Sequence, residues 1–109
     1  AGRLRPMRFI ALVLIAALSL AACGSDPIAA DAPGEQVYAA RCASCHGGDL
    51  GGGVGPALGA GSPSAGEARS YFENVITQGR GTMPSFDGRL TAEQIDAVID
   101  FILERQSGR

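Results

Sequence analysis

The strongest periodic pattern of hydrophobic positions lies near the end of the chain. Four apolar side chains recur at the i, i+3, i+4, i+7 spacing of one helical face: Ile95, Val98, Ile99 and Ile102. Thr91 stands before this stripe, and Gln94 follows Thr91 by three residues, which is the capping-box pattern of a helix start. We therefore predict a C-terminal helix that begins after Thr91, with a frayed end over residues 106–109.

Two earlier segments also have helical patterns. Residues 67–78 place four apolar side chains on one face: Tyr71, Phe72, Val75 and Ile76. Glu67 suits the positive end of the helix dipole, and Gly79 can end the helix. Residues 34–41 predict a short helix that begins with Gly34, a poor helix former. Close contact with another helix explains that glycine better than the alternative, a plain turn.

The middle of the chain has no such pattern. Residues 47–66 hold nine glycines and two prolines, which exclude long regular structure. By composition alone this segment is typical of a flexible linker. No segment alternates as a strand does, and no internal repeat is present. The whole pattern predicts one small all-α domain of three to four short helices and irregular loops.

The first part of the chain is a candidate export signal. Three arginines precede an uncharged apolar run over residues 9–22, which is too short to span a bilayer comfortably. A basic start, a short apolar stretch and small residues at its end predict a secretory signal over residues 1–22. Met7 already begins a sufficient leader, which leaves open whether residues 1–6 belong to the native one.

Cys23 follows the leader directly. The run Leu20-Ala21-Ala22-Cys23 resembles a bacterial lipobox, in which the cysteine is lipidated and becomes the mature N-terminus. The alternative is ordinary cleavage nearby, with Cys23 left as a spare thiol. Residues 23–33 are small, acidic and proline-containing, so we predict a lipidated N-terminus and flexible tether. The expected location is the outer face of the cytoplasmic membrane or another periplasmic membrane face.

The chemistry of the chain is concentrated in Cys42-Ala43-Ser44-Cys45-His46. This segment reads C-x-x-C-H, the attachment pattern of a c-type haem. Two thiols three positions apart on a helical turn can each bond one vinyl group of the porphyrin. The adjacent imidazole then lies where it can ligate the iron. The motif predicts one covalently bound haem c.

Two other interpretations of the Cys-x-x-Cys pair remain open at this point. A zinc site would need further ligands, and His46 is the only histidine in the chain. A thioredoxin-like dithiol would need a βαβ pattern around it, and none is visible. With two cysteines bonded to haem and Cys23 to lipid, no disulfide is expected.

Met83 is the candidate for a second iron ligand. It is one of two methionines and the only one outside the leader, within the predicted loop 81–86. Pro84 biases Met83 toward an extended backbone, which would aim its sulfur consistently. The alternative is a hydrophobic methionine packed at the haem edge without bonding. Residues 47–66, between the two candidate ligands, then suit an irregular loop around the porphyrin edge.

Residues 34–104 resemble the small monohaem class I cytochromes c. Four segments occur in the order of that family: GEQVYAARCASCHG, the GPAL at residues 55–58, ITQGRGTMPSF and the C-terminal helix. The resemblance implies the cytochrome c fold over residues 34–105, wrapped around one covalently bound haem. It implies that Cys42 and Cys45 form the thioethers.

The same resemblance implies roles for further residues. His46 would be the proximal and Met83 the distal iron ligand. The carbonyl of Pro56 would accept a hydrogen bond from the His46 ring, and Leu58 would pack on the haem. The first and last helices would cross at Gly34. The lysine-rich face of the family's eukaryotic members is missing, because this chain has no lysine.

The expected function is single-electron transfer rather than catalysis, because two axial ligands leave no open position on the iron. Membrane-bound donors and acceptors are the expected partners: an oxidase, a dehydrogenase or a quinol–cytochrome complex. Two alternatives stay open: a cytochrome subunit of a membrane oxidase or dehydrogenase complex, and a haem-based ligand sensor if Met83 does not ligate.

Charge narrows the range of partners. From Cys23 onward six arginines face eleven acidic residues, a net charge of −5, which argues against nucleic acid. The acidic surface would suit a basic patch on a redox partner, or it is simply solvated.

Overall fold

The computed structural model describes residue 2 and residues 27–109. Apart from residue 2, the predicted leader lies outside these residues, as does Cys23, so neither the export signal nor the lipidation is tested by the structure. Four helices follow one another: α1 (Gly34–Arg41), α2 (Ala43–His46), α3 (Arg69–Gln78) and α4 (Ala92–Gln106). Bridges are isolated and no sheet forms in the described part, so the all-α prediction is confirmed. None of these helices has the length and apolar character needed to cross a bilayer.

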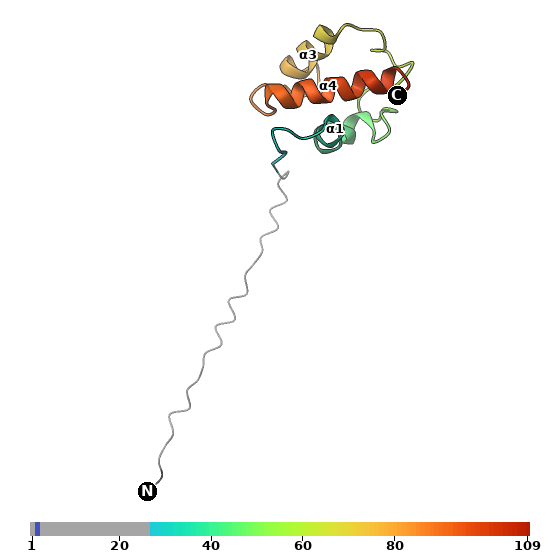
Figure 1. The fold of residues 1–109 in the computed structure, drawn as a ribbon. Helices are drawn as coiled ribbons and strands as arrows, with labels where there is room; N and C mark the ends of the chain where they lie inside the picture. The colour runs from blue at the N-terminus through green and yellow to red at the C-terminus, as the bar shows by residue number, and fades with distance from the viewer. Residues whose placement is uncertain (1, 3–26) are drawn as a thin grey trace.

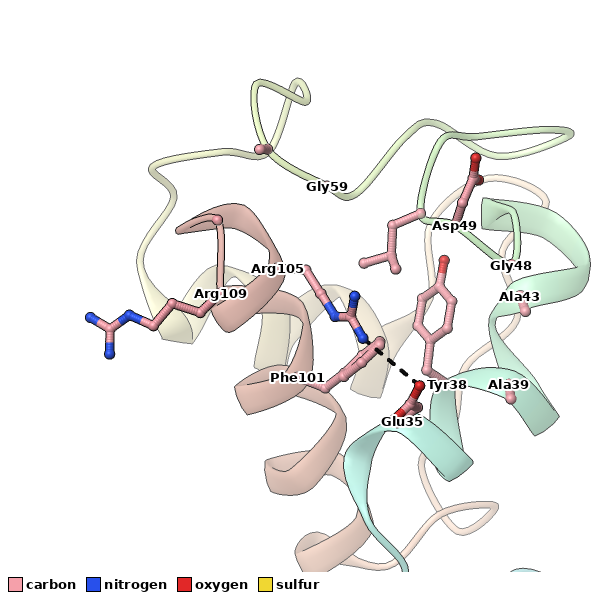
Figure 2. Close-up of a pocket in the computed structure, with 13 residues that line it drawn as sticks. Glu35, Tyr38, Ala39, Ala43, Gly48, Asp49, Gly59, Phe101, Arg105 and Arg109 are labelled. Atoms are coloured by element: carbon pink, nitrogen blue, oxygen red, sulfur yellow. Dashed lines mark ion pairs between the residues drawn. The ribbon is translucent and has the colours of Figure 1, made fainter.

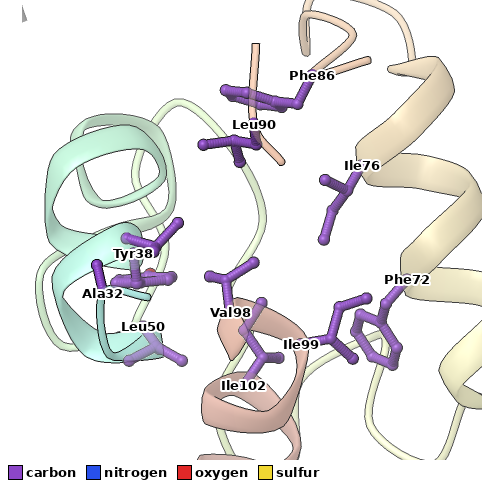
Figure 3. Packing of buried hydrophobic residues seen from close by; sticks show 11 residues of the cluster. Ala32, Tyr38, Leu50, Phe72, Ile76, Phe86, Leu90, Val98, Ile99 and Ile102 are labelled. Atoms are coloured by element: carbon purple, nitrogen blue, oxygen red, sulfur yellow. The ribbon is translucent and has the colours of Figure 1, made fainter. Parts of the chain in front are cut away.

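Helix α4 lies between the other helices. In Figure 1 it runs across the domain with α1 on one side and α3 on the other. It packs on both, whereas α1 and α3 make no contact with each other, and α2 contacts only α1 among the four helices. Figure 3 shows buried side chains from α1, α3 and the 86–90 loop directed toward those of α4. The domain therefore has two halves, which α4 joins.

The capping box at the start of α4 forms as predicted. The Gln94 amide donates to Oγ1 of Thr91 at 3.1 Å, and the Thr91 amide donates to Oε1 of Gln94 at 2.9 Å. The predicted stripe faces the core, with Val98, Ile99 and Ile102 buried and Ile95 half-buried. This confirms the helix and its apolar face.

The predicted frayed end over residues 106–109 needs correction at its first residue. Gln106 is still helical, and its Nε2 donates to the carbonyl of Leu58 at 3.0 Å and to Oγ of Ser64 at 3.2 Å. These two bonds tie the end of α4 to the 58–64 loop. A glutamine beyond the hydrophobic stripe is expected to be exposed to solvent. The hydrophobic pattern therefore could not predict these two hydrogen bonds.

Gly34 allows α1 to cross α4 closely. A Cβ at this position would lie 2.7 Å from the carbonyl carbon of Ala97, still closer to its oxygen, and 2.8 Å from Cβ of Phe101. Tyr38, one turn further along α1, packs on Phe101 with ring centroids 5.3 Å apart. The contact with another helix, rather than a plain turn, therefore explains the glycine.

Gly34→Ala is expected to destabilise the protein in spite of alanine's better helix propensity. The added methyl group cannot avoid the backbone of α4, and overpacking of this kind costs about 1–3 kcal/mol, against about 1 kcal/mol gained in propensity. Thermal unfolding of the haem-loaded protein measures the change. Gly48→Ala is the matched control, because a Cβ there meets no atom within 4 Å. An unchanged or raised midpoint for Gly34→Ala would contradict the account of the crossing.

Helix α3 begins two residues later than predicted. Ala68 is its extended N-cap residue, and Glu67 lies in the preceding turn, where its amide donates to the carbonyl of Ser64 at 3.1 Å. Glu67 therefore lies just before the helix and not in its first turn. Arg69 occupies the first helical position and reaches across to α4, pairing with Asp96 at 3.1 Å and with Asp100 at 2.5 Å.

The segment before α1 is attached to the domain. Nε2 of Gln94 donates to the carbonyls of Ile28 and Ala29, each at 3.0 Å, and the Gln94 side chain is buried. Ala32 is also buried, and Ile28 packs against the core. The predicted flexible tether over residues 23–33 is therefore corrected for 28–32. A hydrophobicity pattern cannot predict a buried glutamine whose amide donates to two backbone carbonyls.

Candidate haem site

The C-x-x-C-H segment forms one short turn of helix. Cys42 lies at the junction of α1 and α2, and the His46 amide donates back to its carbonyl at 3.0 Å. The thiol of Cys42 is half-buried, that of Cys45 is exposed, and both are free. Burial raises the pKa of the Cys42 thiol to about 11, while nearby Arg41 opposes that rise.

Among the described residues, Cys42, Cys45 and His46 have no further side chain near them that would complete a zinc site. Across residues 27–109 no three histidine, cysteine or acidic side chains gather as a cluster that could hold a metal ion. No βαβ unit surrounds the pair either, since the described residues form no sheet. The zinc and thioredoxin interpretations therefore gain no support from the fold.

The His46 ring is held in one tautomer. Its side chain is buried, and Nδ1 lies 2.8 Å from the carbonyl oxygen of Pro56. A carbonyl oxygen can only accept, so Nδ1 carries the proton and donates it. Nε2 is then left with the lone pair that a metal ion uses, and the hydrogen bond fixes the ring plane. This is the bond that the family resemblance implied.

The glycine-rich loop is folded back onto the C-x-x-C-H turn. The Gly52 amide donates to the His46 carbonyl at 2.8 Å, and the Gly55 amide donates to the Cys45 carbonyl at 2.8 Å. Gly52 has a φ of +93°, a conformation that favours glycine. The flexible-linker interpretation is therefore wrong for this part of residues 47–66. The loop caps α2 and carries Pro56 to the imidazole.

Gly55 leaves room for the imidazole, a role that the sequence analysis missed. A Cβ at Gly55 would lie 3.0 Å from Cε1 and 3.1 Å from Nδ1 of His46. Among nine glycines in one segment, the sequence has no signal that separates this one from the others. The fold shows it as part of the cradle that positions the ring.

Gly55→Ala is expected to shift the His46 ring and lengthen its hydrogen bond to Pro56. A weaker bond makes the imidazole a poorer electron donor, so the reduction potential of the haem-loaded protein should rise. Potentiometry and the hyperfine-shifted proton signals of the ring measure the effect. Gly48→Ala should leave both unchanged, because its added Cβ has open space. Equal potentials for wild type and Gly55→Ala would contradict this role.

Gly79 sets the direction of the Met83 loop. At the end of α3 it has φ +74° and ψ 173°, a region open to glycine alone. A Cβ there would lie 2.7 Å from the Met83 carbonyl oxygen and 2.8 Å from the Ser85 nitrogen. The chain therefore turns tightly onto itself, and glycine is required at the turn.

The Met83 loop is also fastened to α3. Met83 and Arg80 exchange backbone hydrogen bonds of 2.9 and 3.1 Å, which closes a tight turn. Oγ of Ser85 donates to the Thr77 carbonyl at 2.6 Å. Met83 is half-buried and packs against the core. Its backbone is thus fixed, and its side chain is directed to the interior side of the domain.

The site residues belong to two structural units. Cys42, Cys45, His46 and Pro56 are brought together by α2 and the loop that folds onto it. Leu58 follows in the same loop, is half-buried and packs against the core. Met83 comes from the separate unit built on α3. Because α2 and α3 do not touch each other, these two units meet only through the rest of the core.

The larger of the two described cavities lies elsewhere. It has a volume of about 510 Å³ and lies between α1, the end of α4 and the 48–60 loop (Figure 2). Arg105 crosses it, 3.8 Å from the carboxylate of Glu35 and 4.9 Å above the ring of Phe101. None of the proposed iron or thioether residues lines this cavity. It is a surface feature of the helix crossing and not the place of the haem.

Comparison with known proteins identifies the family. A family model described as "Cytochrome C oxidase, cbb3-type, subunit III" matches residues 29–102. The chain is 38% identical over 107 residues to cytochrome c6 of Thermosynechococcus vestitus, covering 90% of this chain and 91% of that relative. The structure of cytochrome c6C from Synechococcus sp. PCC 7002 has a TM-score of 0.58 at 30% identity, covering 68% of this chain and 95% of that one.

A further relative is a much larger protein. Quinohemoprotein alcohol dehydrogenase ADH IIB of Pseudomonas putida is 32% identical over 77 residues, covering 67% of this chain but 11% of the enzyme. The matched portion is thus a small part of that protein.

The donor set of the site fits a c-type haem. Two free thiols stand one helical turn apart, and the adjacent imidazole has its Nε2 lone pair available. The cytochrome c6 relatives carry one covalently bound haem c and transfer electrons, and they are not enzymes. The chain therefore belongs to the c-type cytochromes and is a small monohaem class I cytochrome c with the mostly helical fold of that class.

Proposed function

We propose that this cytochrome carries single electrons through a haem whose iron is ligated by His46 and Met83, at the outer face of a bacterial cytoplasmic membrane. The observation that carries the proposal is the 2.8 Å hydrogen bond between Nδ1 of His46 and the Pro56 carbonyl. That bond selects the tautomer and the ring orientation that an axial ligand needs.

The haem, when bound, supplies a one-electron ferric–ferrous couple. The protein's contribution is to hold its ligands in place through both oxidation states. His46 is fixed by Pro56 and by the loop bonded to the α2 carbonyls, and the Met83 backbone is fixed by Gly79 and Ser85. Rigid ligands change little on electron transfer, which keeps the reaction fast.

Met83 as the second ligand is supported by its place in the fold. Its loop leaves α3 through a turn that requires glycine, backbone hydrogen bonds hold the loop, and the half-buried side chain packs against the core. A thioether favours the ferrous form and so raises the potential relative to harder ligands. If His46 and Met83 both bound the iron, no position on it would stay open for a substrate.

The two halves of the domain explain why the cofactor matters for stability. The α2 unit and the α3 unit share no direct helix contact, so a flat apolar group held by His46 on one face and Met83 on the other would join them. A domain of this size buries little apolar surface without such a group. We expect the chain without haem to be poorly folded.

Membrane-bound donors and acceptors are the proposed partners, and respiring membranes test this. In membranes that contain the protein, substrate addition should reduce the haem and oxygen should oxidise it again within one turnover of the chain. A haem that stays in one oxidation state during steady respiration would contradict the carrier function.

A second candidate function is an electron-transfer subunit of a membrane oxidase or dehydrogenase complex. The description of the family model and the partial match to an alcohol dehydrogenase favour it. The two functions predict different behaviour on purification. A subunit should co-purify with its oxidase or dehydrogenase complex in mild detergent, whereas a carrier should separate from such complexes. Ligand sensing would become the preferred function only if Met83 does not bind the iron.

Cys23→Ser is expected to release the protein from membranes. The proposed acyl chains contribute about 0.8 kcal/mol per buried methylene, and two or more chains anchor stably. We expect the wild type in the membrane fraction, from which detergent releases it. We expect the variant in the aqueous fraction or as the unprocessed precursor. The haem content should be the same in both proteins. Wild-type protein found entirely in the aqueous fraction, or a mature mass without acyl chains, would contradict lipidation.

A further inference from the structure

Leu50 has a backbone conformation that leucine rarely adopts. Its φ is +61°, and among the described residues no other non-glycine residue has a positive φ. In this left-handed region Cβ crowds a backbone carbonyl oxygen, so a bulky side chain is disfavoured. The other residues of 47–66 with positive φ are all glycines: Gly47, Gly52, Gly61 and Gly66. The backbone at Leu50 would thus suit glycine better, which indicates that its side chain is needed.

The side chain of Leu50 joins the glycine-rich loop to the hydrophobic core. It is 4% exposed and is the only buried residue of 47–63. Figure 3 shows it near Tyr38 of α1, and both residues line the cavity at the crossing of α1 and α4. The Gly47 carbonyl accepts from the Tyr38 hydroxyl at 2.7 Å and from the Leu50 amide at 3.1 Å. Leu50 is therefore attached to the helix crossing through its side chain and its backbone.

The backbone of Leu50 also closes the loop that carries Pro56. Its carbonyl accepts from the Leu58 amide at 2.9 Å and from the Gly59 amide at 3.2 Å. Both ends of the 50–59 loop are therefore joined at Leu50. Within the closed loop lies Pro56, whose carbonyl oxygen is 2.8 Å from Nδ1 of His46. The position of Leu50 thus sets where that carbonyl meets the imidazole.

We propose that Leu50 is a positioning residue for the haem ligand. Its buried side chain fixes the closed loop on the α1–α4 crossing and so holds the Pro56 carbonyl on the His46 ring. A strained backbone persists only where its surroundings over-determine it, and the core supplies that constraint here. The inference rests on the proposed function, in which His46 ligates the iron. It couples the packing of the helix crossing to the reduction potential, because the Nδ1 hydrogen bond sets how strongly the imidazole donates.

Three substitutions at Leu50 in the haem-loaded, full-length protein test this role. Leu50→Ala should shift the hyperfine-shifted proton signals of the His46 ring and raise the reduction potential. Exchange of the Gly52 and Gly55 amides should become at least about 30-fold faster relative to the amides of α4, the factor expected when a buried leucine side chain is lost. Leu50→Gly should change the same quantities by less, because glycine suits the positive φ. Leu50→Met keeps the volume and should behave as wild type.

Ile99→Ala is the matched control, since it removes an equally large buried side chain from α4, outside the loop. It should lower the unfolding midpoint but leave the ring signals and the potential at their wild-type values. An equal rise of the potential in Ile99→Ala would overturn the positioning role in favour of general loosening. Wild-type ring signals and potential in Leu50→Ala, or in Leu50→Gly if the alanine variant does not load haem, would overturn it while leaving the ligation intact. A wild-type protein without hyperfine-shifted imidazole signals would overturn the ligation by His46, and the inference with it.

Discussion

The double variant Cys42→Ser, Cys45→Ser is expected to lose its covalent haem completely. In each thioether the thiol adds across a vinyl group, and serine hydroxyls do not form that bond under the same conditions. Wild-type chain should retain haem through denaturing electrophoresis and stain by its peroxidase activity, with one haem added to the mass of the chain. The double variant should show neither, and each single variant should show much less than the wild type.

The same variants test the structural part of the account. Because α2 and α3 have no contact with each other, loss of the haem should leave the domain poorly folded, with weakened helical circular dichroism and no cooperative unfolding. Ser44→Ala is the matched control: it lies between the two cysteines, is exposed and should retain haem. Full haem retention by the double variant would contradict covalent attachment at this motif.

Met83→Ala is expected to convert the cytochrome from an electron carrier into a ligand-binding protein. Loss of the sulfur removes the weak charge-transfer band that ferric methionine-ligated haem has near the red edge of the visible spectrum. The vacated position should bind carbon monoxide in the ferrous state. The potential should fall by a sizeable fraction of the ~0.8 V range over which axial ligands act.

Met83→Leu separates ligation from packing. Leucine restores nearly the same apolar volume but offers no sulfur, and the loop itself stays fastened through Gly79 and Ser85. If Met83 ligates, the leucine variant should lose the band and bind carbon monoxide as the alanine variant does. If Met83 only packs at the haem edge, the leucine variant should behave as wild type, and the assignment would be wrong.

Helix α4 and the C-x-x-C-H turn could be predicted because their signals are local. The Thr91–Gln94 capping box and the stripe behind it need only a few neighbouring residues to be recognised, and both form as expected. Gly34 is the one case in which a local signal indicated a distant contact. A poor helix former at a helix start indicated a close helix crossing, and the carbonyl of Ala97 lies beside Gly34.

The remaining features depend on partners far away in sequence. No hydrophobic pattern marks Gln94 or Gln106 as a buried residue, yet each uses a backbone carbonyl more than 40 residues distant. Burial of such a side chain is possible only where a partner meets it. The ion pairs of Arg69 with Asp96 and Asp100 of α4 likewise join residues far apart in sequence.

The haem site also has some features that local sequence signals predict and others that depend on distant residues. The motif identified His46, and the resemblance named Pro56 as its hydrogen-bond partner, which the structure has at 2.8 Å. The role of Gly55 depends on the absence of a side chain beside the ring, and only the folded loop shows which glycine is involved. Composition made the loop look flexible, because the bonds from its amides to the α2 carbonyls leave no pattern in the sequence.

A spectroelectrochemical titration of the wild-type haem-loaded protein, with and without carbon monoxide, tests the central claim most directly. A carrier with His46 and Met83 on the iron should give a single one-electron transition, the weak ferric band in the red, and a ferrous spectrum that carbon monoxide leaves unchanged. A ferrous protein that binds carbon monoxide readily, or a ferric spectrum without the red band, would contradict the proposed ligation and with it the electron-carrier function.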